Sequence, residues 1–396
     1  MDTTFTNALF PDGELKSFRV SGGRIASIGA ASGAADGSSA VDLGGSLVIP
    51  GLVEGHIHLD KTFLGDGWRP HRPCTNGFNV RERVAFEKAF LAAAEPVKVR
   101  GSALIETVVA FGTLHMRSHV DIDPQAGLSN LKAVVGLRDS YRDSVSIEIV
   151  AFPQSGIVTA PGTAELLEEA VKNGADLIGG LDPAGFDGDV DGHLDVVFGI
   201  AERNGVGIEI HLHDPDTLGL MQLEEIARRT TALGMQGHVS VSHAYSLGGV
   251  PESAMRHTGE ILARAGVSIM TNAPGNHGFP PVLPLREVGV NVFAGNDNIR
   301  DSWWPYGDGD MLERAMMIGY RSGFYTDDEL AAAFDLATAA AARALRLENY
   351  GLAEGANADF VVLDAAHVQE AVVARPVRRQ VYKAGRLVAE NGAYCG

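Results

Sequence analysis

The residues best suited to chemistry are histidines and aspartates that stand where apolar runs of the sequence stop. His56 and His58 are two positions apart in one such run, so on a strand their imidazoles project to the same side. Other runs end in His211-Leu212-His213-Asp214, in Ser242-His243 and in Gly295-Asn296-Asp297-Asn298. Imidazole nitrogens with a carboxylate oxygen suit Zn²⁺ or Fe²⁺. The pattern predicts that one divalent metal binds His56, His58, His211 and Asp297, with room for a water.

Simpler roles are also open to these histidines. A single His-x-His pair on a strand is more often incidental than metal-binding, and His211 with His213 would also fit as polar residues at a barrel mouth. Four strand ends that each supply a metal-ligand type favour the metal site. The remaining histidines lack such partners, and we expect them to pack in the core or to lie on the surface: His115, His119, His193, His238, His257, His277 and His367.

The elements expected to position these residues are eight parallel strands. The middle of the chain alternates apolar, β-branched runs with longer helical stretches, which is typical of βα units. Helices are expected over residues 164–173 and 191–204, because Asn173-Gly174 and Asn204-Gly205 are good helix stops. The strands should end near His58, His119, Gln154, Asp182, His213, His243, Ala273 and Asp297.

Eight such units predict an α/β protein with a (β/α)₈ TIM barrel, whose active site forms at the C-terminal ends of the strands. A doubly wound open sheet is the alternative, but no glycine-rich dinucleotide fingerprint follows the early strands.

The two ends of the chain have a different texture, with short strands between turns. Strands are expected over residues 17–20, 24–28 and 46–49, with a hairpin signal at Ser21-Gly22-Gly23 and a loop of small residues over 31–40. Residues 358–363, 379–382 and 386–388 look the same. We expect residues 1–50 and 350–396 to form one small β domain, which leaves residues 51–349 for the barrel.

Composition excludes several kinds of partner. The chain of 396 residues has 32 Lys and Arg against 50 Asp and Glu, a net charge of −18, which repels nucleic-acid phosphates and anionic lipid headgroups. Two cysteines, Cys74 and Cys395, cannot make a disulfide framework, so a cytoplasmic location is expected. Neither a signal peptide nor an apolar run of about 18 residues is seen. Assembly into a homo-oligomer stays open, since it is common among soluble enzymes.

Two segments carry a family resemblance. Residues 50–61 (PGLVEGHIHLDK) resemble the strand-one motif of the amidohydrolase superfamily, and residues 355–364 (GANADFVVLD) resemble its C-terminal β-sandwich motif. Within that superfamily the chain is similar to the cytosine deaminase group, from about residue 17 to 390. The segments that carry this likeness are 117–121 (RSHVD), 151–156 (AFPQSG), 211–214, 242–244 and 297–309 (DNIRDSWWPYGDG). The fold implied is a distorted (β/α)₈ barrel with a flanking β-sandwich.

The resemblance also implies roles for single residues. His56, His58, His211 and Asp297 would bind one metal ion, Zn or Fe. His243 would hydrogen-bond a metal-bound hydroxide, and Asp297 would collect its proton. The substrate would be a small heterocycle, hydrogen-bonded at its polar edge by Gln154 and walled by Trp303. Two-metal members usually carry a carbamylated lysine at the end of strand four, whereas this chain has Gly179-Gly180-Leu181-Asp182, so a single metal is expected.

Three positions leave alternatives. Lys61 follows the histidine motif and either forms an ion pair at the barrel mouth or faces the substrate. Cytosine deaminases have a glutamate where this chain has Asp214; since aspartate is one methylene shorter, either His213 or Asp214 would deliver the proton to the leaving group. They have an aspartate where this chain has Asn298, which can donate as well as accept and should change the preferred ring edge.

The function predicted is that of a metal-dependent aminohydrolase, a deaminase acting on an exocyclic C–N bond of a nitrogen heterocycle. The substrate would be a pyrimidine such as cytosine or an analogue, or an s-triazine such as an N-alkylammelide. The alternatives are a cyclic amidase that opens a ring C–N bond, and a non-catalytic scaffold with the same fold. Residues 63–90 either cover the pocket or form a surface excursion and a helix.

Overall fold

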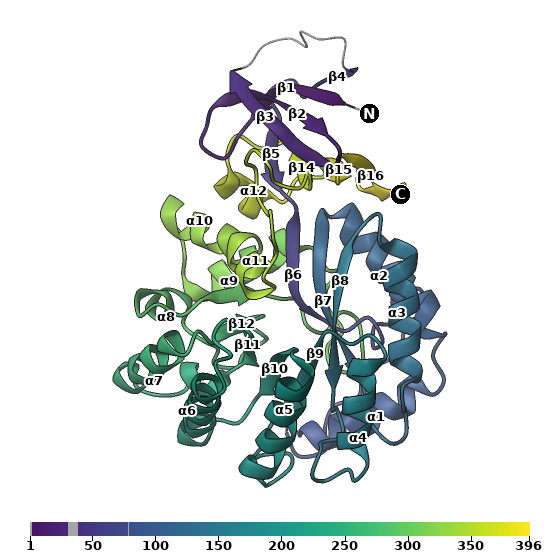
Figure 1. Cartoon of the computed structure of the whole chain (residues 1–396), viewed down its shortest axis with the longest axis vertical. Helices are drawn as coiled ribbons and strands as arrows, with labels where there is room; N and C mark the ends of the chain where they lie inside the picture. Colours follow the sequence, from purple (N-terminus) through teal and green to yellow (C-terminus); the bar gives the residue numbers. More distant parts are fainter. Residues whose placement is uncertain (1, 31–38, 78) are drawn as a thin grey trace.

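The computed structural model describes residues 2–30, 39–77 and 79–396. Within these residues the strands form two sheets, one of eight strands and one of nine. Figure 1 shows that the nine-stranded sheet forms one end of the molecule and holds both chain termini, while the barrel forms the rest. The predicted fold, a (β/α)₈ barrel with a small β domain built from the terminal segments, is confirmed.

The barrel strands follow one another in chain order, and every neighbouring pair is parallel. All five residues of β9 (Leu177–Leu181, LIGGL) are buried, which agrees with the apolar run that predicts this strand. The strands end where the sequence predicts: β6 (Leu52–Ile57), β7 (Thr113–Asp121), β8 (Ser146–Phe152), β9 (Leu177–Leu181), β10 (Gly207–Leu212), β11 (Val239–His243), β12 (Ser268–Thr271) and β13 (Val292–Ala294).

The barrel closes through a narrow seam between its first and last strands. Among the described residues, the backbone pairing there is a single parallel bridge between Ile57 and Asp297, and the side chain of Glu54 accepts hydrogen bonds from Asn296. Beside it, the backbone N–H of Asp297 donates to the carbonyl oxygen of His56 at 2.7 Å. The first and last strands thus share fewer backbone hydrogen bonds than the other neighbouring strands do. In this sense the barrel is distorted.

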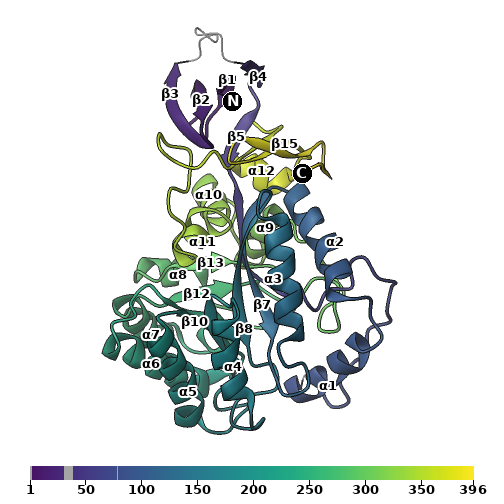
Figure 2. The same ribbon diagram turned by 45° about the vertical axis from the view of Figure 1, so that its right-hand side comes forward.

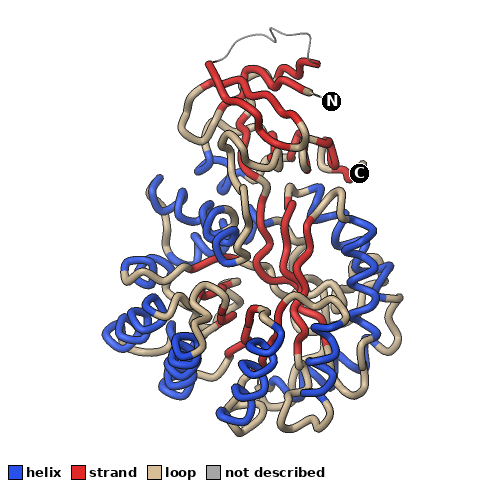
Figure 3. Tube along the Cα trace, in the orientation of Figure 1, coloured by secondary structure: helices blue, strands red, loops and turns tan. Residues whose placement is uncertain are grey.

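Helices surround the barrel strands, as the outer blue layer of Figure 3 shows. Helices α4 and α5 match the predicted ranges to within one residue at each end, and Gly174 and Gly205 follow them with positive φ, as predicted. The helices of the barrel are α1 (Val80–Leu91), α2 (Val97–Ala110), α3 (Ser129–Tyr141), α4 (Thr163–Lys172), α5 (Val190–Asn204), α6 (Asp216–Ala232), η1 (Tyr245–Gly248), α7 (Glu252–Arg264), α8 (Val282–Glu287), α9 (Met311–Ser322), α10 (Asp327–Leu336) and α11 (Ala339–Ala344).

The small β domain joins the two ends of the chain. Strand β5 pairs antiparallel with β14, which brings the terminal segments together as predicted. The ring of Phe5 stacks on Phe18 and meets Phe360 edge-on, each at 5.0 Å, so strands from both ends share one aromatic core. The elements are β1 (Thr3–Leu9), β2 (Leu15–Ser21), β3 (Arg24–Ala30), β4 (Ser39–Asp42), β5 (Leu47–Pro50), β14 (Phe360–Leu363), α12 (Val368–Ala374), β15 (Arg378–Lys383), β16 (Arg386–Glu390) and β17 (Ala393–Tyr394).

Strands β1, β4 and β17 are additions to the prediction. Most of the predicted loop over residues 31–40 lies outside the described residues, and its last two residues begin β4. The domain division after residue 50 and before residue 350 stays a prediction.

Polar contacts fasten the small β domain to the barrel. Strand β5 leads directly into β6, the strand labelled in Figure 1. Figure 2 shows that this is where the small β domain meets the barrel. Asp359, just before β14, accepts hydrogen bonds from Lys383 Nζ at 2.8 Å and from Nε2 of His115 on β7 at 3.0 Å. His115 is therefore a packing residue, as expected. In the described part of the chain, no helix is both long enough and apolar enough to cross a membrane.

Candidate active site

Histidines from several strands meet one aspartate at the C-terminal end of the barrel. Potential ligand atoms of His56, His211, His243 and Asp297 all lie within 4.8 Å of one another, and so do those of His56, His58 and His119. Nε2 of His58 is 3.2 Å from Oδ1 of Asp297, which links the two groups. The structure thus brings together all four predicted ligands, with His243 beside them.

These side chains fit a bound cation because their nitrogens otherwise lack partners. Both ring nitrogens of His211 and His243, Nε2 of His56 and Nδ1 of His58 are buried without a hydrogen bond. Buried polar groups nearly always have a hydrogen-bond partner. A cluster of buried nitrogens without one, arranged around a carboxylate, therefore indicates that a ligand binds here. Imidazoles with one carboxylate suit Zn²⁺ or Fe²⁺, as the sequence predicts.

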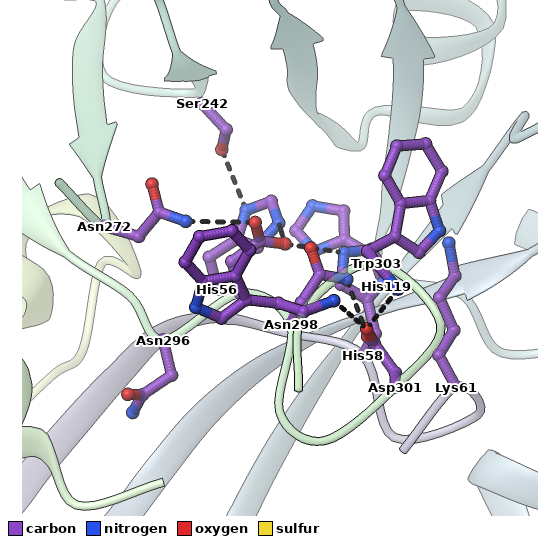
Figure 4. A network of polar contacts seen from close by, with 12 residues as sticks. His56, His58, Lys61, His119, Ser242, Asn272, Asn296, Asn298, Asp301 and Trp303 are labelled. Atoms are coloured by element: carbon purple, nitrogen blue, oxygen red, sulfur yellow. Dashed lines mark hydrogen bonds and ion pairs between the residues drawn. The ribbon is translucent and has the colours of Figure 1, made fainter. Parts of the chain in front are cut away.

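His56 is oriented by residues beneath the cluster. Its Nδ1 lies 2.9 Å from Oε1 of Glu209 and 2.8 Å from Oγ of Ser242, the second contact being drawn in Figure 4. Glu209 in turn accepts from Nη1 of Arg117 at 2.6 Å. Sequence reasoning missed Glu209, although it precedes His211 by two positions on the same strand and therefore faces the same side.

Electrostatics favour the protonation states that bind a metal. Burial depresses the pKa of His211 and of His243 well below the usual range, so both rings are neutral. Although burial opposes it, hydrogen bonding with His56 and His58 holds the pKa of Asp297 well below its usual range, so this carboxylate is ionised. Neutral imidazoles and ionised carboxylates are the forms that ligate metals.

The pKa values of His56 and His58 are shifted in opposite directions. Burial, together with the charge of Lys61, lowers the pKa of His58 to about 3. Against the effect of burial, Asp297 and Glu209 raise the pKa of His56 to about 9. Metal binding to this ring therefore releases a proton.

Backbone strain gathers at the same end of the barrel. Five residues other than glycine have positive φ at the end of a barrel strand or just past it: Asp182 (36°), His243 (72°), Ala244 (42°), Ala273 (45°) and Asp297 (62°). Such angles are uncommon for residues with a Cβ atom and concentrate at functional sites. Two of the five, His243 and Asp297, are predicted site residues.

A cavity opens beside the cluster. Its outer part has a volume of about 690 Å³ and its deeper part about 280 Å³. Both parts are lined by His213, Asp297, Asn298 and Trp303, and the deeper part also by Lys61 and Gln154. Every side chain predicted to contact the substrate therefore faces the same space beside the cluster.

His213 and Asp214 differ in orientation. Nδ1 of His213 lies 2.8 Å from Oδ2 of Asp182, which directs the other ring nitrogen away from Asp182, and the ring stacks on His243 at 4.6 Å. Asp214 instead accepts from the backbone N–H of Gly185 at 2.9 Å and from Nε2 of Gln222 at 2.8 Å. Asp214 does not line either part of the cavity, although His213 lines both.

Lys61 forms a buried ion pair and also lines the cavity. It lines the deeper cavity, and its buried ammonium forms an ion pair with Asp121 at 3.0 Å. Oε2 of Glu87 on α1 is 3.5 Å from the same ammonium and accepts from Nε1 of Trp303. Arg83, also on α1, lines the outer part of the cavity, so residues 63–90 contribute to its wall, as one of the two interpretations expects; Phe78 lies outside the described residues.

The expectation for His119 holds only in part, because the ring is buried but lies beside other candidate ligands. Rather than lacking partners, its fully buried ring stacks on His56 at 3.9 Å, and both of its nitrogens are without a hydrogen bond. The available signal was its place at the end of a predicted strand, beside the strand of His56 and His58 in the predicted order.

Comparison with known proteins agrees with this geometry. Residues 39–389 match the model described as "Amidohydrolase family". The chain is 33% identical to N-isopropylammelide isopropyl amidohydrolase of Pseudomonas sp. (strain ADP), over 89% of this chain and 88% of that one. The crystal structure of N-isopropylammelide isopropylaminohydrolase from Burkholderia multivorans ATCC 17616 is 42% identical, with a TM-score of 0.95 and complete coverage of both chains.

A further relative is more distant. The crystal structure of 5-methylcytosine deaminase from Klebsiella pneumoniae liganded with 5-fluorocytosine is 28% identical, with a TM-score of 0.85 over 98% of this chain and 97% of that one. The resemblance to the cytosine deaminase group, and the prediction of a hydrolase for C–N bonds other than peptide bonds, are confirmed. The chain belongs to the amidohydrolase family.

Proposed function

We propose that the protein hydrolyses an exocyclic C–N bond of a nitrogen heterocycle and releases ammonia or an amine. The observation that carries this proposal is the position of the histidine–aspartate cluster at the floor of a cavity lined by Gln154, Asn298 and Trp303. The names of two relatives contain N-isopropylammelide and 5-methylcytosine, both flat heterocycles with an exocyclic nitrogen.

The metal assignment follows from the donor set. His56, His58, His211 and Asp297 would hold one divalent metal, Zn or Fe. Such a metal, when bound, lowers the pKa of a coordinated water from 15.7 to about 7. Strand β9 ends in Leu181 and is followed by Asp182, so it supplies no lysine to bridge a second ion.

The protein's own residues would move the protons. Asp297, which is ionised, accepts a proton from the attacking water as its oxygen adds to the ring carbon. His213 donates a proton to the departing nitrogen as the exocyclic C–N bond breaks, since its Nδ1 is engaged by Asp182. His243 stabilises the negative charge that develops on oxygen. Asp214 is the weaker candidate for the donor because it is turned toward Gly185 and Gln222.

Substrate contacts follow from the lining of the cavity. Gln154 and Asn298 would bind the polar edge of the ring, Trp303 would cover its face, and Lys61 would support Gln154. An N-alkylated s-triazine is favoured over cytosine, because Asp214 and Asn298 both depart from the cytosine deaminase pattern.

A screen for amine release tests the proposal. The purified protein is loaded with Zn²⁺ or Fe²⁺ and offered cytosine, isocytosine, methylated cytosines, ammelide and N-alkylammelides. We expect release of the alkylamine from at least one N-alkylammelide, faster than ammonia from cytosine. A carboxylate product without any amine would replace this proposal with ring opening. If the protein bound no transition metal and metal loading gave no turnover, a scaffold role would replace it.

A further inference from the structure

The deeper cavity is lined by two side-chain amides, and the orientation of one of them is determined by a buried charge. Gln154 and Asn298 are these amides. An amide presents either its carbonyl oxygen, an acceptor, or its NH₂ group, a donor, and the two look alike in shape. Which group faces the ligand decides which edge of a heterocycle the protein binds.

Lys61 determines this choice for Gln154. Nζ of Lys61 donates to Oε1 of Gln154 at 2.8 Å. An ammonium has three donors and no acceptor, so a reversed amide would place its NH₂ group against a positive charge. The contact turns the carbonyl oxygen of Gln154 toward Lys61, which leaves both N–H donors of the amide for a ligand.

Lys61 is itself held in place by two carboxylates on different elements. Asp121 at the end of β7 lies 3.0 Å from Nζ, and Glu87 on α1 lies 3.5 Å from it. The lysine side chain is 2% exposed, so water does not screen these contacts. Glu87 also accepts from Trp303, and Figure 4 shows Lys61 beside this indole. The ammonium therefore cannot move into the cavity without separating two buried carboxylates from their counter-ion.

We infer that Lys61 is a positioning residue which turns Gln154 into a hydrogen-bond donor, so that the site selects heterocycles presenting an acceptor to it. This inference rests on the proposed function and sharpens its substrate class. The acceptor is a ring nitrogen with a free lone pair or a carbonyl oxygen on the ring. Heterocycles that present an N–H group at this edge would be rejected, since two donors would face each other.

The substitution Gln154→Glu tests the polarity directly. Glutamate has the same length and keeps its attraction to Lys61, but it offers the ligand only acceptors. With an N-alkylammelide that the wild-type protein hydrolyses, we expect KM to rise about ten- to hundredfold while kcat changes little. An unchanged KM would overturn the inference, because it would mean that Gln154 already serves as an acceptor.

A double-mutant cycle tests whether Lys61 acts through Gln154. We expect Lys61→Met and Gln154→Met each to raise KM about tenfold or more, and the double variant to be no worse than Gln154→Met alone. Fully additive effects would overturn the inference. If Lys61→Met fails to fold, because Asp121 and Glu87 lose their partner, the Gln154→Glu result still decides the question.

Lys88 supplies a matched control. It is the neighbour of Glu87 on α1, pairs with Asp123 at 2.7 Å and donates to Ser155 at 2.8 Å, but it does not line the cavity. Lys88→Met should leave KM unchanged in both the wild-type and the Gln154→Met backgrounds. If the wild type releases amine but the effects of the Lys61 and Gln154 substitutions are additive, this inference alone is wrong. If the wild type shows no turnover, both the proposed function and this inference are wrong.

Discussion

Nδ1 of His56 lies 2.9 Å from Oε1 of Glu209, so the opposite nitrogen of the same ring is the one that faces Asp297. A carboxylate behind a ligating histidine fixes the ring orientation and raises its basicity. Glu209 is anchored in turn by Arg117, whose guanidinium also pairs with Glu148 at 2.6 Å. The predicted metal ligands therefore depend on a second layer of buried charges inside the barrel.

The substitution Glu209→Gln should weaken metal binding by about ten- to hundredfold, because His56 loses its charged partner. Competition with a chelator, followed by elemental analysis, measures the affinity. Glu148→Gln is the control, since it changes the other partner of Arg117 and does not touch His56. Equal metal affinities for the Glu209 variant and the wild type would contradict this role.

The substitution Asp297→Asn should abolish nearly all turnover. The variant keeps the size of the side chain but loses the charge that we propose binds the metal and accepts the proton. Asparagine also tolerates the positive φ of 62° at this position better than alanine does, so the fold should persist. Turnover and circular dichroism are the measurements, and an active Asp297→Asn protein would show that the assignment is wrong.

His213→Asn and Asp214→Asn together test which residue donates the proton. Loss of general acid catalysis typically lowers the rate by about 10² to 10⁴, and we expect this loss in kcat only for the His213 variant. Asp214→Asn should have a small effect, because one oxygen can still accept from Gly185 and Gln222. A large loss in kcat for Asp214→Asn with normal stability would reverse the assignment.

His115 should make folding stability depend on pH. Burial is the main cause that lowers the pKa of this ring, with Lys383 adding to it and Asp359 opposing it. The folded protein keeps the ring neutral, whereas the unfolded chain binds a proton below its ordinary pKa of about 6.5. This contribution is present above that pH and declines as the pH falls, by at most about 1.4 kcal/mol per unit.

Urea unfolding at pH 7.5 and pH 5.5 measures this dependence. His115→Gln keeps a hydrogen-bonding group near Asp359 but cannot titrate, so it should lose less stability between these two pH values than the wild type. Both proteins are compared at the same metal content, because other buried histidines also bind protons. Equal losses would show that His115 does not contribute.

Much of the site was predictable because the ends of the barrel strands can be recognised in the sequence. His56, His58, His211 and Asp297 each follow an apolar run, and barrel topology brings such positions to one end. The glycines after α4 and α5 mark helix ends by a local conformational rule, which is also visible in the sequence.

What could not be predicted depends on distances between strands. His119 ends a predicted strand, but only the structure shows that its ring stacks on His56. The orientations of Asp214 and Gln154 are set by partners from other elements, Gln222 and Lys61. Spacing along the chain does not encode these contacts, because each partner reaches its neighbour through tertiary packing.

The position of the candidate metal ligands at the seam of the barrel links metal binding to the folding of the barrel. The carbonyl of His56 accepts from the N–H of Asp297, so the first and last barrel strands meet where two predicted ligands stand. A chain that stops before β13 would keep the histidines but lack the carboxylate, and it would leave strand edges open to association with other chains. A metal ion bound by these residues would hold the first and last strands of the barrel together. A protein that retains the metal would therefore be one whose barrel has closed.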